Sequence, residues 1–71
     1  MELANYSALL REVEHQIVYC RYKARRQREI LAQATEGDDN VPEVQSLLGM
    51  FEELEAIHVA DHDRLLNQLS L

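Results

Sequence analysis

Two histidines in the C-terminal half of the chain have the spacing of a metal site on a helix. His58 and His62 are four residues apart, so a helix would place both side chains on one face. Glu55 precedes His58 by three residues, and this Glu-x-x-His pattern occurs in the carboxylate-bridged di-iron sites of helical bundles. Glu12 and His15 repeat the pattern near the N-terminus. These residues indicate one candidate function, a metal site formed between the chains of a helical bundle.

The positions of the two motifs weaken the metal hypothesis. His15 lies about half a turn away from the apolar seam of its own predicted helix, and Glu12 also points away from that seam. The motifs therefore cannot converge inside one chain, and a shared site would need a second copy. The alternative is that His58 is a polar residue within an apolar surface, with His62 at its edge. We favour this alternative and expect neither a bound metal nor a cofactor.

Cys20 is the one cysteine, and its position argues against nucleophilic catalysis. It occupies an apolar seam, where a thiol is expected to be buried and unreactive. The sequence contains no glycine-rich phosphate loop, no Ser-His-Asp set and no Cys-x-x-Cys motif. We therefore expect a protein that is not an enzyme, and a single cysteine fits a reducing compartment.

Size and composition bound the remaining classes of protein. The chain has 71 residues and a net charge of -6, and 46% of its residues are hydrophobic, which is too many for a disordered chain. No apolar run approaches the roughly 20 residues that span a membrane. The first residues lack the basic start and apolar stretch of a signal peptide. We expect a cytoplasmic protein without a membrane partner.

The elements that must position these residues are two helices. Residues spaced alternately by three and four form a seam over more than four heptads, which predicts one helix over about 3–36. The residues of this seam are Leu3, Tyr6, Leu10, Val13, Ile17, Cys20, Ala24, Gln27, Leu31 and Ala34.

A turn over about 37–42 separates this helix from a second one over about 43–69. Gly37 can end the first helix in the left-handed conformation. Asn40 and Glu43 have the spacing of a capping box, and Pro42 suits a first helical turn. A turn this short predicts an all-α fold, a two-helix antiparallel hairpin that resembles a coiled coil. Because such a small core is marginal, we expect a partner chain or self-association to complete it.

Protein binding is the function that the apolar residues favour. The apolar arc of the second helix is wider than one seam requires, and we assign its surplus edge to Leu48, Met50, Ile57 and Leu66. On the first helix, Tyr19 and Tyr22 lie off the seam and form a second candidate patch, since tyrosine is enriched in interfaces.

The basic residues between 21 and 28 have two interpretations. In the hairpin, residues whose numbers add to about 80 lie opposite each other. Arg25, Arg26 and Arg28 then come level with Glu52, Glu53 and Glu55, so the basic stretch faces the acidic helix of its own chain. The alternative is a homodimeric four-helix bundle that binds RNA or DNA through residues 21–28, which the net charge of -6 disfavours.

Several short strings resemble the small helical-hairpin co-chaperones of bacterial type III secretion, which assist the needle subunit. The resemblance covers about residues 17–58 and uses strings that are short and unspecific. The first predicted helix runs about a turn longer before Pro42 than in that family. The matching strings are Ile17-Val18, Ala24-Arg25-Arg26-Gln27, Pro42-Glu43, Leu47-Leu48 and Leu54-Glu55-Ala56-Ile57.

The resemblance implies a function in virulence-associated secretion. A co-chaperone of this family packs on a second, helical-repeat chaperone, and the two together hold the needle subunit in the cytosol before export. Such a hairpin is an adaptor and needs no catalytic residue.

Overall fold

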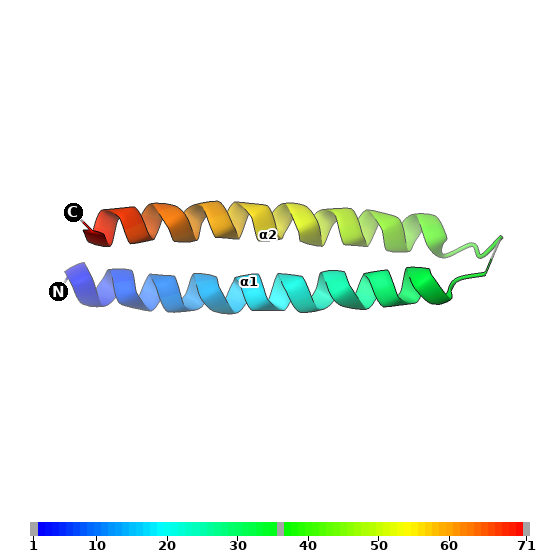
Figure 1. Cartoon of the computed structure of the whole chain (residues 1–71), viewed down its shortest axis with the longest axis horizontal. Helices are drawn as coiled ribbons and strands as arrows, with labels where there is room; N and C mark the ends of the chain where they lie inside the picture. The colour runs from blue at the N-terminus through cyan, green and yellow to red at the C-terminus, as the bar shows by residue number, and fades with distance from the viewer. Residues whose placement is uncertain (1, 36, 71) are drawn as a thin grey trace.

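The structure, a computed structural model, describes residues 2–35 and 37–70 of the chain. It contains two helices, α1 (Glu2–Gln33) and α2 (Val41–Ser70), which run antiparallel side by side (Figure 1). The pair forms a rod with Cα extents of 55 × 14 × 13 Å. The predicted all-α hairpin is therefore confirmed. Within the described part of the chain, neither helix is apolar over a length that could cross a membrane.

The seam of α1 supplies the core of the hairpin. Four of the described side chains are buried, namely Leu10, Ile17, Cys20 and Ala24, and all four are seam positions. Cys20 is buried, as its seam position predicted. The side chain of Leu3 lies outside the described residues.

The residues of α2 that face α1 are half-buried, and none of residues 41–70 is fully buried. Their spacing in the sequence alternates between three and four residues, like that of the seam of α1. Each of them has α1 on one side and solvent on the other, because a two-helix hairpin has no second layer. These residues are Val41, Val44, Leu48, Phe51, Glu55, His58, His62, Leu65 and Leu69.

The first helix ends at Gln33, about three residues before the predicted end near 36. The Ala34 N–H donates to the Leu31 carbonyl at 3.2 Å, a bond to the third residue back that tightens the last turn. Gly37 follows with a φ of 87°, a left-handed conformation that favours glycine. Glu36 lies outside the described residues.

The second helix begins at Val41, two residues earlier than predicted. The Asn40 carbonyl accepts the Val44 N–H at 3.0 Å, so Asn40 is the residue that precedes the helix. The predicted capping box is wrong in one respect. The Asn40 N–H donates to Asp38 Oδ1 at 2.9 Å instead of to Glu43, because the Asp38 side chain forms a turn with the residue two positions ahead of it.

Candidate protein-binding face

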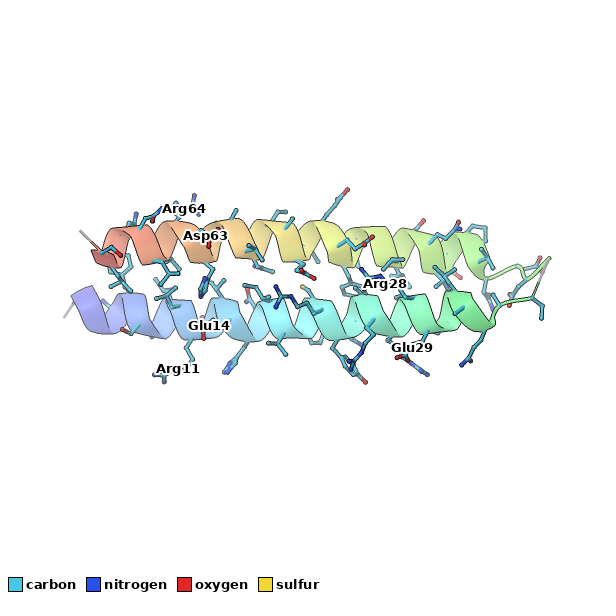
Figure 2. All side chains as sticks on the ribbon, in the orientation of Figure 1. Arg11, Glu14, Arg28, Glu29, Asp63 and Arg64 are labelled. Carbon is cyan, nitrogen blue, oxygen red and sulfur yellow. The ribbon has the colours of Figure 1, made fainter. Side chains whose placement is uncertain are left out.

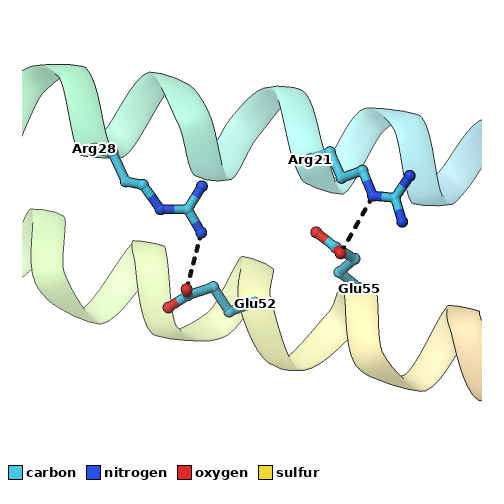
Figure 3. A network of polar contacts seen from close by, with 4 residues as sticks. All are labelled: Arg21, Arg28, Glu52 and Glu55. Atoms are coloured by element: carbon cyan, nitrogen blue, oxygen red, sulfur yellow. Dashed lines mark hydrogen bonds and ion pairs between the residues drawn. The ribbon is translucent and has the colours of Figure 1, made fainter.

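Ion pairs between the helices mark one flank of the hairpin. The Arg28 Nη2–H donates to Glu52 Oε2 at 2.9 Å, and the Arg21 Nε–H donates to Glu55 Oε2 at 3.3 Å (Figure 3). Both pairs join α1 to α2, with arginine on the first helix and glutamate on the second. We call this side of the seam the ion-pair flank, since these two pairs define it.

The ion pairs test the predicted register of the basic stretch. Arg28 extends from α1 toward α2 and meets Glu52, while Glu29 points away from α2 (Figure 2). Arg21 pairs with Glu55, and Arg26 pairs with Glu29 of its own helix at 3.6 Å. Of the three arginines predicted to meet the acidic helix, Arg28 alone does so among the described residues, and the Arg21–Glu55 pair was not predicted. These pairs are exposed, so each stabilises the fold by only about 0–1 kcal/mol.

Arg25 has no carboxylate partner among the described residues. It lines a shallow hollow on the ion-pair flank together with Val18, Arg21, Tyr22 and Arg28. Two of the three arginines of this hollow are already paired with glutamates of α2. The positive charge available to an outside ligand is therefore smaller than the sequence of residues 21–28 indicates.

A row of apolar side chains lies on the other flank of the seam. Leu47, Met50, Leu54 and Ile57 are spaced by three, four and three, which aligns them along one side of α2. Leu47, Met50 and Ile57 are exposed, and Leu54 is half-buried. Glu52 leaves α2 on the ion-pair flank, so this row is on the opposite flank.

Tyr19 and Ile30 extend this row onto α1. The Tyr19 ring meets the Phe51 ring in a T-shaped contact, with centroids 6.5 Å apart, and Lys23 Nζ lies 5.5 Å from the Tyr19 ring centroid. Ile30 is seven residues beyond Lys23, so it lies on the same side of α1. We call Tyr19, Ile30, Leu47, Met50, Leu54 and Ile57 the apolar face.

The structure separates the residues that the sequence assigned to protein binding. Met50, Ile57 and Tyr19 belong to the apolar face. Leu48 is half-buried in the seam, in register with Phe51 and Glu55, which both contact α1. Tyr22 and Leu66 are exposed but lie away from the apolar face, with Tyr22 in the hollow beside Arg25.

Sequence reasoning did not single out three members of the apolar face. Leu47 and Leu54 lie beside the predicted surplus edge of the second helix but were not assigned to it. Ile30 was assigned to neither candidate patch. The missing signal was the seam of α2, because a seam through Glu55, His58 and His62 turns Leu54 toward the outer row.

That polar stretch of the seam is the least expected feature of α2. Glu55, His58 and His62 occupy three successive seam positions, and all three are half-buried against α1. His62 Nε2 lies 3.1 Å from Glu14 Oε1, which gives this ring a partner on α1. The sequence predicted His62 only at the edge of an apolar arc, and the contact with Glu14 was missed because it joins residues 48 apart.

The histidines do not gather with other ligands in the described part of the chain. Within residues 2–35 and 37–70, no group of three His, Cys, Asp or Glu side chains has the geometry to hold a metal ion. His15 and Glu12 are exposed on α1, as the metal hypothesis had to assume for a site between chains.

Comparisons with known proteins leave the family open. No protein-family model, curated protein or solved structure matches the chain.

Proposed function

We propose that the chain is a small cytosolic adaptor that binds an apolar helix of another protein on its apolar face. One observation carries this proposal. Between residues 50 and 62, α2 turns Glu55, His58 and His62 toward α1, while Met50 and Ile57 face solvent. A hairpin under selection for its own stability alone would place these apolar side chains in the seam. Their outward position is typical of a surface that another chain covers.

The shape of the face favours a helix as the ligand. Leu47, Met50, Leu54 and Ile57 form a straight row along a rod, and Tyr19 and Ile30 form a second row beside it on α1. The two rows border a strip in which the apolar side of an amphipathic helix can lie, with its anchors spaced by three or four residues.

The resemblance to type III secretion co-chaperones gives this proposal a concrete partner. A second helical-repeat chaperone would cover the apolar face, and the pair would hold the needle subunit before export. The proposed role uses no catalytic residue and no cofactor.

A matched pair of substitutions tests the proposal. Ile57 is 56% exposed on the apolar face, and Val18 is 64% exposed on the ion-pair flank, so either can become glutamate with little effect on the fold. The tagged wild-type chain and both variants are purified from the host, and the proteins that accompany them are compared. We expect Val18→Glu to retain the partner of the wild type and Ile57→Glu to lose it. Equal recovery with both variants would show that the apolar face is not the binding site.

A binding assay with RNA or DNA at several salt concentrations tests the nucleic-acid alternative. Arg25→Glu removes the arginine of residues 21–28 that has no carboxylate partner among the described residues. Binding to RNA or DNA that falls steeply with salt and with Arg25→Glu would replace the adaptor proposal.

A further inference from the structure

The surface area of the hairpin shows that a large part of it is available for burial. A compact monomer of 8.3 kDa exposes about 4,600 Å² by the usual scaling of area with mass. The hairpin exposes 5594 Å². The excess is about 1,000 Å², and a standard interface buries about 800 Å² on each partner. One interface of ordinary size would therefore bring the chain to the surface area of a compact protein.

Among the described residues, the apolar face is the surface that best suits such an interface with a second copy. Two chains that each carry a net charge of -6 repel each other, so their contact must avoid the acidic residues. The apolar face meets this condition, since its row on α2 carries no acidic residue from Leu47 to Ile57 at this spacing, and Lys23 lies beside Tyr19. Its row on α2 ends at Glu43 and Asp61, the next positions at the same spacing.

The charges also select how two copies can meet. A two-fold axis across the helices, perpendicular to the rod, would place α1 of one copy on α1 of the other, and α2 on α2. Lys23 would then face Lys23 of the second copy, and Glu43 would face Asp61. An axis along the rod sets α1 of one copy on α2 of the other, at the levels that Arg21–Glu55 and Glu14–His62 fix within each hairpin. Lys23 then comes level with Glu53 of the second copy.

We propose that, without its partner, the chain is a homodimer in which two apolar faces close on each other as a four-helix bundle. In this arrangement Tyr19 of one copy lies opposite Ile57 of the other, and Ile30 lies opposite Leu47. Every helix is antiparallel to both of its neighbours, which is favourable for the helix dipoles. This proposal rests on the proposed function, because both use the apolar face. When the adaptor binds its partner, the second copy must therefore leave that face.

The mass of the purified chain in solution tests the dimer. Light scattering over a range of concentrations should give the mass of two chains for the wild type and for Val18→Glu. Ile57→Glu should give the mass of one chain, with its helicity by circular dichroism retained. A wild type that stays at the mass of one chain, or an Ile57→Glu variant that stays at two, would overturn the proposal.

Cysteine cross-linking tests the arrangement. In a Cys20→Ala background, an oxidised mixture of Tyr19→Cys and Ile57→Cys chains should form the mixed dimer in preference to either like dimer. A Lys23→Cys chain that cross-links efficiently to itself would instead show the axis across the helices and overturn the arrangement proposed here.

The two proposals fail in different experiments. A monomeric wild type that still loses its host partner on Ile57→Glu would remove the homodimer and keep the adaptor. A wild-type dimer whose host partners survive Ile57→Glu would keep the homodimer and remove the adaptor.

Discussion

The Tyr19 ring of α1 meets the Phe51 ring of α2 edge to face, with the ring planes at 77° and the centroids 6.5 Å apart. Phe51 is a seam residue and Tyr19 belongs to the apolar face, so this contact joins the packing of the hairpin to its candidate binding surface. The position of Tyr19 on that surface therefore depends on Phe51.

Truncation of Phe51 should destabilise the hairpin. A fully buried Phe costs about 3–5 kcal/mol on truncation to Ala, and we expect about 2–4 kcal/mol for the half-buried Phe51. Urea unfolding of Phe51→Ala, Tyr19→Ala and the double variant gives the energy of the pair, which should be about 0.5–1.5 kcal/mol. An unchanged melting temperature in Phe51→Ala would place its ring outside the packing between the helices.

The two glycines should respond to alanine in opposite directions. Gly37 has a φ of 87°, so Gly37→Ala strains the turn and should lower the free energy of unfolding by about 1 kcal/mol. Gly49 lies inside α2, and a Cβ atom there would meet nothing within 4 Å. Gly49→Ala should therefore raise the free energy of unfolding by about 0.5–1 kcal/mol. Thermal unfolding of both variants measures these two changes in stability. A loss of stability in Gly49→Ala would show that another chain lies close to Gly49 in the assembled protein.

Replacement of a polar seam residue should stabilise the hairpin. His62 is half-buried against α1, so His62→Leu adds apolar burial and should raise the free energy of unfolding by about 1 kcal/mol. His15→Leu is the control, because His15 is exposed and should change stability by less than about 0.5 kcal/mol. A loss of stability in His62→Leu would show that the contact with Glu14 contributes more than the added burial.

A charge exchange tests the ion-pair flank. Arg28→Glu places a second carboxylate beside Glu52 and should cost about 1 kcal/mol, whereas Arg25→Glu should cost less. Adding Glu52→Arg to Arg28→Glu should restore most of the loss. The differences in stability between these variants and the wild type should shrink at high salt, because exposed charges are screened. Equal losses at low and high salt would show that side-chain packing, and not charge, is responsible.

The fold follows from local rules in the sequence, and most of it could be predicted. The alternation through Leu10, Ile17, Cys20 and Ala24 repeats at every turn of α1, and Gly37 with Pro42 limits the turn from both sides. The exact ends were less predictable. They depend on single hydrogen bonds such as the one from the Asn40 N–H to Asp38, for which Glu43 was an equally good candidate in the sequence.

The candidate site was harder to predict than the fold, because it depends on which of two adjacent rows of α2 faces α1. An arc that contains Leu54 and Ile57 as well as His58 and His62 permits either choice, and apolar content alone favours the wrong one. The structure sets the choice through contacts between distant residues, such as Arg21 with Glu55 and Glu14 with His62. Patterns read along one helix do not contain that information.

The hairpin topology also has a consequence for the order in which the chain folds. Arg28 and Glu52 are 24 residues apart in the sequence, Arg21 and Glu55 are 34 apart, and Glu14 and His62 are 48 apart. The entropy lost in closing a loop grows with its length, so contacts near the turn close first and those at the open end last. Substitutions near Gly37 should therefore slow refolding, while substitutions around His62 should mainly speed unfolding.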